Sequence, residues 1–357
     1  MNSPNATDKA AVGEAPSGIL LVRLSAMGDV IHVLPAYNLL RRRFPQARID
    51  WLIEDRFAPL IRDYPGLNGL IRVPRGKGER CVTQYPQVLR ELRRNRYDVT
   101  IDFQGLTKSA VWGFLAGIPV RVGYGDKDGR EISKIFYSRK VIPSLTKTHV
   151  IERNLALAQF VAGESHSVAP EFPVDRQAAE KAEDFWRKSD LTGAPVVGLS
   201  PGAGWRTKTW PAERFGELAR WFKTKGWQCL VLWGPGEESL AKEVQKVDPG
   251  VVVAPPTDLK DLAELIRRTS LFVAGDTGPL HLAAFLGIPC IGLYGASDPQ
   301  RNGPYGVPAR VITVDCAEAP CWKTRCPKED SLCLSALSVD RVIRETEVLL
   351  AEIKIST

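Results

Sequence analysis

The chain has 357 residues, of which 44% are hydrophobic and 25% charged, close to the average of globular proteins. This composition excludes a wholly disordered, collagen-like or coiled-coil chain, and no apolar run reaches the length of about 18 residues that a transmembrane helix needs. The net charge of +7 lies entirely in residues 1–175, which hold 25 Lys and Arg against 18 Asp and Glu, whereas residues 176–357 hold 23 of each. A basic half indicates an anionic partner, such as a phosphorylated lipid, a membrane surface or a nucleic acid, although a solvated basic face would have the same composition.

Residues 1–17 lack the basic start and the apolar core of a secretory signal. We expect them to form a disordered leader, and we expect the protein to be cytoplasmic.

From residue 18 onward, short apolar runs alternate with amphipathic segments of helix length. The predicted strands are 18–24, 48–53, 97–102, 195–200, 227–233, 251–253, 270–274 and 289–294. The predicted helices lie near 29–43, 82–95, 105–116, 151–162, 211–225, 236–246, 258–268, 279–286 and 338–352. Strands that are apolar throughout and alternate with helices are typical of parallel sheets covered on both faces. The pattern therefore predicts an α/β protein built from doubly wound, Rossmann-like domains.

The alternation begins near the N-terminus and starts again after a polar stretch in the middle of the chain. We therefore predict two domains, over 18–175 and 195–337, joined by a linker at 176–194 and followed by a C-terminal helix at 338–357. In doubly wound sheets, ligands bind beyond the carboxyl ends of the strands, and two facing domains would enclose a cleft there.

The first predicted strand is followed by Gly28 and Asp29 at the start of a helix. Gly28 permits a tight turn between the strand and the helix. Asp29 suits an N-cap, a role that stabilises a helix by about 1 kcal/mol. The same position presents a carboxylate at the mouth of the sheet, so a capping role and a functional role are both open.

Polar and basic side chains also follow the third predicted strand, where Asp102, Gln104 and Lys108 cluster at a turn into a helix. A glycine-rich, basic segment comes next and leads into another helix. Its candidates are Arg130, Lys134, Arg139, Lys140, His149 and Arg153. Together these side chains could receive an anionic ligand, whereas each one alone also fits an ordinary surface position.

The second half opens with a loop, GLSPGAGWRTKTWP, that has the features of a phosphate or nucleotide site. Gly202 and Gly204 would let the backbone approach a ligand, Arg206 and Lys208 add positive charge, and a helix N-terminus follows. The P-loop pattern is absent. The next strand is followed by Glu237 and Glu238, which could hold ribose hydroxyls or interact with a helix dipole.

A buried strand then runs into Asp276, Thr277 and Gly278 at the start of a helix. Backbone N–H groups there, with the helix dipole behind them, would suit a diphosphate. His281 lies one turn into that helix and fits either a ligand contact or a core position.

Other motifs give little support to other chemistry. No dinucleotide fingerprint or zinc-protease motif occurs, and a G-x-S-x-G match at 198–202 lacks the helix that a nucleophile elbow needs. The late cysteines Cys316, Cys321, Cys326 and Cys333 do not have the usual paired spacing of a zinc ribbon, so packed thiols are expected and a small structural metal site is the alternative.

Taken in order, the motifs LLVRLSAMGDVIHVLPA, DFQGLTKSA, SPGAGWRTKTWP, LWGPGEE and VAGDTGPLHLAAFLGIPCIGLYG resemble the bacterial ADP-heptose:lipopolysaccharide heptosyltransferases of glycosyltransferase family 9. The resemblance spans about residues 18–350. The pairing of SAMGDVIH with DFQGLTKSA and IFYSRK is similar to the branch that adds the first heptose to Kdo-lipid A, whereas the Cys-rich tail looks more like other branches.

The resemblance implies a GT-B fold and a metal-independent, inverting heptose transfer without a cofactor. The first domain would bind the Kdo-lipid A acceptor at the cytoplasmic face of the inner membrane, the second would bind ADP-heptose, and the final helix would cross back to the first domain. Asp29 would be the general base, and Lys208 would neutralise the leaving ADP. Glu238 would hold the ribose, with Glu237 as the second choice.

The remaining candidates divide between the two substrates. Those for the donor are Gly204, Arg206, Thr207, Asp276, Thr277, Gly278 and His281. Those for the acceptor are Gly28, Gln104, Lys108, Arg130, His149 and Arg153. The competing hypotheses are a family-9 enzyme with a later core acceptor or another nucleotide sugar, a non-catalytic nucleotide-sugar or lipid-binding protein, and a nucleic-acid-binding protein. No nucleic-acid-binding motif accompanies the basic half, so we expect no nucleic-acid partner.

Overall fold

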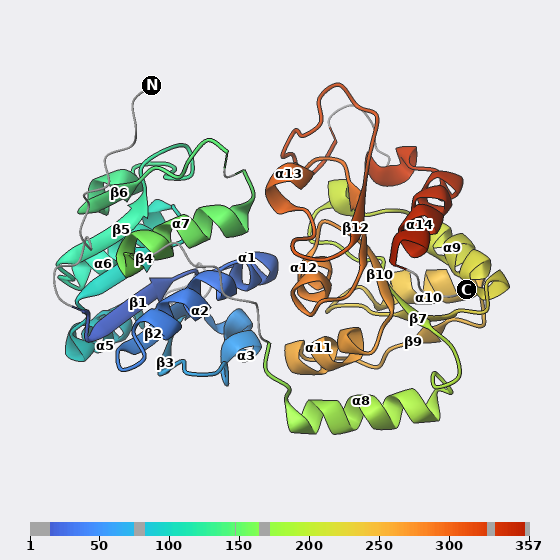
Figure 1. Ribbon diagram of the computed structural model, residues 1–357, viewed down its shortest axis with the longest axis horizontal. Helices are drawn as coiled ribbons and strands as arrows, with labels where there is room; N and C mark the ends of the chain where they lie inside the picture. Colours follow the sequence, from blue (N-terminus) through green and yellow to red (C-terminus); the bar gives the residue numbers. More distant parts are fainter. Residues whose placement is uncertain (1–14, 75–82, 147, 164–171, 327–332, 354–357) are drawn as a thin grey trace. The chain divides into compact units, whose positions relative to one another are not determined.

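The computed structural model describes residues 15–74, 83–146, 148–163, 172–326 and 333–353. The chain divides into two compact units, Met1–Pro173 and Val174–Thr357 (Figure 1). Most of the predicted leader, residues 1–14, lies outside the described residues.

Unit 1 alternates strands and helices from its first described element. Its elements are β1 (Gly18–Val22), α1 (Met27–Ile31), α2 (Leu34–Arg43), β2 (Arg48–Glu54), η1 (Asp55–Phe57), α3 (Ala58–Ile61), β3 (Gly69–Val73), α5 (Tyr85–Asn95), β4 (Val99–Asp102), α6 (Thr107–Leu115), β5 (Val120–Tyr124), η2 (Ser133–Phe136), β6 (Arg139–Val141) and α7 (Val150–Ala162). The sheet is parallel, in the order β3-β2-β1-β4-β5-β6.

The central strand β1 is buried along its whole length, as its sequence GILLV requires. Its residues Leu20 and Val22 share a core cluster with side chains of α5 and α6, such as Leu92 and Trp112. Helix α7 packs against α2 and touches β5 and β6. Helices α5, α6 and α7 thus pack against the sheet, which is the layered arrangement predicted from the sequence.

Unit 2 repeats the scheme. Its elements are α8 (Arg176–Lys188), β7 (Val196–Ser200), η3 (Arg206–Lys208), α9 (Ala212–Thr224), β8 (Gln228–Val231), α10 (Glu238–Val247), β9 (Val252–Val253), α11 (Leu259–Arg267), β10 (Leu271–Gly275), α12 (Gly278–Phe285), β11 (Cys290–Tyr294), α13 (Pro299–Asn302), β12 (Ala309–Thr313), η4 (Cys333–Ala336) and α14 (Val339–Ile353). Its parallel sheet has the order β12-β11-β10-β7-β8-β9.

The second core lies between this sheet and helices α9, α10 and α14. Val197, Val273 and Ile291 from the central strands pack in one cluster with Phe215 and Leu349 from two of these helices. In unit 1 the strand order reverses at β1, with β2 and β3 on one side and β4, β5 and β6 on the other. In unit 2 it reverses at β7, with β8 and β9 on one side and β10, β11 and β12 on the other. The carboxyl ends of the central strands therefore form the edge at which a doubly wound sheet binds ligands.

The structure corrects several boundaries. The segment 176–194, predicted as a linker, contains helix α8, which is capped by Asp175 and packs against α11, so the linker prediction is wrong there. The helix predicted over 29–43 is divided into α1 and α2. The C-terminal helix α14 is present and packs on α9 and β12 of its own unit, and its predicted return to the first domain stays a prediction.

Four short strands were not predicted, namely β3, β5, β6 and β12. Three of them, β3, β6 and β12, lie at or next to the edge of a sheet and are only partly buried, so they lack the continuous apolar run of a central strand. Among the described residues, no helix combines the length and the apolar character that crossing a membrane requires.

Candidate functional site

The loop after β1 holds Asp29 in an ion pair with Arg23, with 2.6 Å between Nη2 of Arg23 and Oδ2 of Asp29. The Arg23 side chain is buried, whereas 40% of the Asp29 side chain is exposed. Asp29 is the third residue of α1, and its carboxylate accepts a hydrogen bond from the backbone N–H of Ala26 at 3.2 Å. Asp29 is therefore not the N-cap residue, but it does satisfy a donor of the first turn while keeping an accessible carboxylate.

Arg23 was not predicted as a site residue. Its Nη1 donates to the carbonyl of Phe103 at 2.5 Å, so one guanidinium joins the loop after β1 to the end of β4. Gln104 makes a second connection, because its Oε1 accepts from the backbone N–H of Leu24 at 2.8 Å and of Ser25 at 3.3 Å. The structure thus gives Gln104 a positioning role in the loop that carries Asp29. Gly28 lies buried inside α1 rather than in the turn before it.

Asp102 is buried and accepts hydrogen bonds from the Tyr137 hydroxyl at 2.7 Å, the Ser109 hydroxyl at 2.8 Å and the backbone N–H of Gln104 at 2.9 Å. Burial raises the pKa of Asp102 above its ordinary value, against the lowering effect of these donors. A carboxylate enclosed in this way orders the turn after β4 and is not a candidate base for an external substrate.

The predicted acceptor residues beyond β5 take different roles. Arg153 is buried and forms ion pairs with Asp126 and Asp128, so its charge is neutralised inside the unit, and a direct charge contact with an acceptor is not supported. His149 is also buried and serves as the N-cap of α7, its Nδ1 accepting from the N–H of Ile151 at 3.2 Å. Arg130 is exposed, and its backbone N–H donates to the carbonyl of Gly105 at 2.8 Å.

Lys108 lies in the first turn of α6 with its side chain half exposed, and its Nζ is 3.5 Å from Oε1 of Glu54. Of the predicted acceptor residues, Lys108 and Arg130 therefore offer exposed positive charge in unit 1.

In unit 2, Lys208 and His281 meet at Asp276. The Lys208 Nζ is 2.6 Å from one carboxylate oxygen, and the His281 Nε2 is 2.9 Å from the other. Burial opposes ionisation of Asp276, but the hydrogen bond and charge of His281 and the charge and hydrogen bond of Lys208 outweigh it and hold the pKa of Asp276 below its ordinary value. The carboxylate is therefore ionised at neutral pH.

Three contacts position Lys208 and the turn that carries it. Its carbonyl lies so close to β10 that a Cβ at Gly275 would come within 2.2 Å of it, which explains the glycine there. The neighbouring Thr207 is buried and donates from Oγ1 to the carbonyl of Lys323 at 2.7 Å. The Lys208 Nζ also lies 4.4 Å from the centre of the Trp205 ring, within the range of a cation–π contact. The predicted donor residue Thr207 thus has an anchoring role.

Thr277 is the N-cap residue and Gly278 the first residue of α12, directly after the buried strand β10. Asp276 precedes them and brings Lys208 to this helix N-terminus. A lysine ammonium and the positive end of a helix dipole therefore lie at one carboxyl edge of the sheet, an arrangement of the kind that stabilises a diphosphate in proteins. The sequence predicted a helix start at residues 276–278, but it did not predict the contact with Lys208.

The two glutamates after β8 differ in their surroundings. Glu237 lies against the glycine loop, because a Cβ added at Gly202 would come within 2.0 Å of the Glu237 carboxylate. The Oε2 of Glu237 also accepts a hydrogen bond from the N–H of Gly234 at 2.8 Å. Glu238 is exposed and pairs with Lys242 one turn along α10, at 2.7 Å. The geometry thus favours Glu237 over Glu238 as the acid next to the loop that carries Gly204 and Arg206, both of which are exposed.

Among the described residues, no three His, Cys, Asp or Glu side chains lie close enough together to hold a metal ion. Among the late cysteines, Cys316 is exposed and the others are partly buried.

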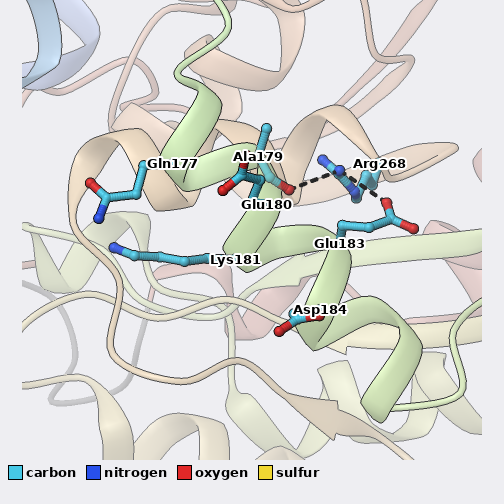
Figure 2. A pocket seen from close by; sticks show the side chains of 7 residues that line it. All are labelled: Gln177, Ala179, Glu180, Lys181, Glu183, Asp184 and Arg268. Atoms are coloured by element: carbon cyan, nitrogen blue, oxygen red, sulfur yellow. Dashed lines mark hydrogen bonds and ion pairs between the residues drawn. The ribbon is translucent and has the colours of Figure 1, made fainter.

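A separate hollow of about 700 Å³ lies on α8 and is open to solvent (Figure 2). Arg268 crosses it to the Ala179 carbonyl and to Glu183, and its lining includes none of the predicted site residues described here.

Known proteins resemble this chain over most of its length. A family model described as glycosyltransferase family 9 (heptosyltransferase) matches residues 86–331. The chain is 29% identical over 354 residues to lipopolysaccharide heptosyltransferase 1 of Pseudomonas aeruginosa, covering 93% of this chain and 98% of the relative. It is 30% identical over 310 residues to lipopolysaccharide heptosyltransferase 2 of Escherichia coli, covering 82% and 87%.

Solved structures agree. The E. coli heptosyltransferase WaaC with ADP matches with a TM-score of 0.70 at 28% identity, over 94% of this chain and 98% of that one. The same enzyme with ADP-2-deoxy-2-fluoro heptose matches with a TM-score of 0.72 at 27% identity, over 93% and 99%. These matches and the two parallel sheets confirm the predicted GT-B fold class. The chain belongs to glycosyltransferase family 9, the heptosyltransferase family.

Proposed function

We propose that this enzyme transfers a heptose from ADP-L-glycero-D-manno-heptose to the Kdo-lipid A inner core during lipopolysaccharide biosynthesis. The similarity to lipopolysaccharide heptosyltransferase 1 over nearly the whole chain supports this substrate pair. So do the structural matches to an enzyme solved with ADP and with an ADP-heptose analogue.

The observation that carries the proposal is the cluster of Lys208, Asp276 and His281 at the N-terminus of α12. On departure, ADP gains charge on the oxygen that held the sugar. Lys208, Arg206 and the helix N-terminus supply positive charge at that edge of unit 2, and fixed charges of this kind stabilise a transition state. Asp276 holds the ammonium of Lys208 in position before the donor binds.

Asp29 is the proposed general base of unit 1. It takes the proton of an acceptor hydroxyl while that oxygen forms a bond to the anomeric carbon of the heptose and the bond from this carbon to the ADP oxygen breaks. A single displacement inverts the anomeric centre and needs no covalent intermediate. The exposed carboxylate, held by Arg23 and by the N–H of Ala26, supports this role.

The transfer is proposed to be metal-independent, because side chains and a helix N-terminus supply the charge that a divalent ion would otherwise bring to the diphosphate. Turnover should therefore survive excess EDTA. Inactivation by EDTA that magnesium promptly reverses would contradict this part of the proposal.

The enzyme is further proposed to work in the cytoplasm, in peripheral contact with the inner membrane, because its acceptor is a lipid. The positive charge of residues 1–175 supports this location for the acceptor side.

The test of the proposed function is turnover of the purified protein with ADP-heptose and either Kdo-lipid A or Kdo-lipid A that already carries one heptose. Transfer to the first acceptor alone is expected. Transfer to the second alone would indicate a later step in core assembly, an alternative favoured by the 30% identity to heptosyltransferase 2. Donor binding without transfer to either acceptor would indicate a non-catalytic protein.

A further inference from the structure

Unit 1 gathers exposed apolar side chains in one part of its sequence. Among the described residues, the large apolar side chains of this unit that are exposed all fall between residues 114 and 145. They are Phe114, Leu115, Ile132, Ile135, Ile142 and Leu145. Ile135 and Ile142 are each more than two-thirds exposed, and Leu145 is 95% exposed.

The elements that carry or adjoin these residues, α6, η2, β5 and β6, are neighbours in the fold. The short helix η2 packs on α6, and the rings of Phe114 and Phe136 meet with their centres 5.5 Å apart. Strand β6 follows η2 and is the edge strand of the sheet, paired on one side only with β5 (Figure 1). Beyond β6, the Ile142 side chain lies over Gly125 at the end of β5.

Basic side chains alternate with the apolar ones along the same segment. Residues 114–145 contain six Lys and Arg and three acids. All three acids are engaged within the unit, because Asp126 and Asp128 pair with Arg153 and Glu131 accepts from the N–H of Thr107 at 3.0 Å. The basic side chains Arg139 and Lys140 are exposed on β6 itself.

We propose that this surface, formed by Ile132, Ile135, Ile142 and Leu145 with Lys134, Arg139 and Lys140, docks the enzyme on an anionic lipid bilayer. Exposed isoleucines and leucine would enter the boundary between headgroups and acyl chains, and the basic side chains would meet anionic headgroups. A soluble anionic sugar would account for the charges but not for the exposed apolar side chains between them. This inference gives a surface to the peripheral membrane contact of the proposed function and rests on it in that respect.

The experiment measures partition of the full-length protein between buffer and sedimented vesicles, with no substrate present. Vesicles of phosphatidylcholine with phosphatidylglycerol are compared with vesicles of phosphatidylcholine alone. Wild type is expected to bind the anionic vesicles and to be released from them by salt. The variant Ile132→Ser/Ile135→Ser should partition at least about tenfold less well. The variant Lys134→Gln/Arg139→Gln/Lys140→Gln should lose roughly a hundredfold.

The matched control is Val348→Ser, which removes a similarly exposed apolar side chain from α14 in unit 2 and should leave partition unchanged. All variants should have the circular dichroism spectrum and the thermal unfolding transition of wild type, which shows that both units are folded. Equal partition of wild type and both surface variants would overturn the proposal. It would also be overturned if light scattering without vesicles showed a dimer that the isoleucine variant abolishes, since a second copy would then cover the surface. Vesicle binding needs no turnover, so a protein that binds vesicles but transfers no heptose would refute the proposed function alone.

Discussion

Arg23 and Asp29 form an ion pair at 2.6 Å in which the arginine is buried and the aspartate is partly exposed. The guanidinium also reaches the carbonyl of Phe103, so it fixes the carboxylate relative to two neighbouring strands. A base held in this way loses little freedom when the acceptor arrives, and this is the form of pre-organisation that favours reaction.

Replacing Arg23 should therefore affect chemistry more than binding. We expect Arg23→Met to lower kcat by about tenfold or more, with little change in the acceptor KM or in ADP affinity, because it frees Asp29 from its fixed orientation. Arg23→Lys keeps the charge but cannot reach both Asp29 and Phe103, so it should fall between wild type and Arg23→Met. Steady-state kinetics of the three proteins provide the check. A rise in KM alone would assign Arg23 to acceptor binding instead.

Lys208 should matter most for the departing nucleotide. We expect Lys208→Met to reduce turnover by about 100- to 1000-fold, since it removes a fixed charge at the developing negative oxygen. The hydrogen bond from Thr207 to the Lys323 carbonyl and the backbone hydrogen bond from the N–H of residue 208 to the Trp205 carbonyl remain, so the variant should stay folded. Calorimetry with ADP and single-turnover rates separate the loss of binding from the loss of chemistry. Unchanged values for both would remove Lys208 from the donor site.

The two glutamates offer a matched pair for the ribose contact. Glu237→Gln should weaken ADP binding by about ten- to a hundredfold, because its carboxylate lies against the glycine loop. Glu238→Gln changes an exposed residue paired with Lys242 and should leave ADP affinity near the wild-type value. The same titration with both variants decides between them, and the opposite ranking would restore Glu238 as the ribose residue.

Stability in acid should depend on Asp276. Its folded pKa is depressed below the ordinary value of 3.8, so it binds a proton less readily in the folded chain than in the unfolded one. Its contribution to stability is therefore fully present above about pH 4 and is lost as the pH falls through the lower folded pKa. Urea unfolding of wild type and Asp276→Asn should show a stability difference that shrinks as the pH falls below about pH 4. A difference that grows as the pH falls below that value would have the wrong sign.

The sequence predicted the sheets well where strands are buried on both faces. The runs that became β1, β7, β10 and β11 are apolar apart from Ser200 at the end of β7, and the structure buries every residue in them. Edge strands such as β6, with the sequence RKV, carry no such signal, because only one side of the strand is paired. Helix α8 was missed because its exposed face is strongly charged, and its buried side is mainly two alanines and Trp186.

The sequence indicated individual residues for the candidate site, but it did not predict which of them are in contact. Asp276 and Lys208 were both selected from their motifs, yet they are 68 residues apart, and only the pairing of β10 with β7 shows that they meet. Arg23 gave a weak signal, a charge directly after a buried strand, and its role depends on Phe103 in another strand. Arg153 was selected for its charge, which Asp126 and Asp128 neutralise.

The sequence left two roles open for Asp29, one at the start of the helix and one in catalysis, and a single substitution can distinguish them. An asparagine at this position can still accept the hydrogen bond from Ala26 N–H, so the helix start should survive, but it cannot take a proton. The most direct measurement is therefore transfer from ADP-heptose to Kdo-lipid A by wild type and by Asp29→Asn, with folding checked by circular dichroism. We expect wild type to transfer heptose and the variant to be slower by about 100- to 10,000-fold, with nearly unchanged ADP affinity. A folded Asp29→Asn protein that turns over at close to the wild-type rate would contradict this expectation.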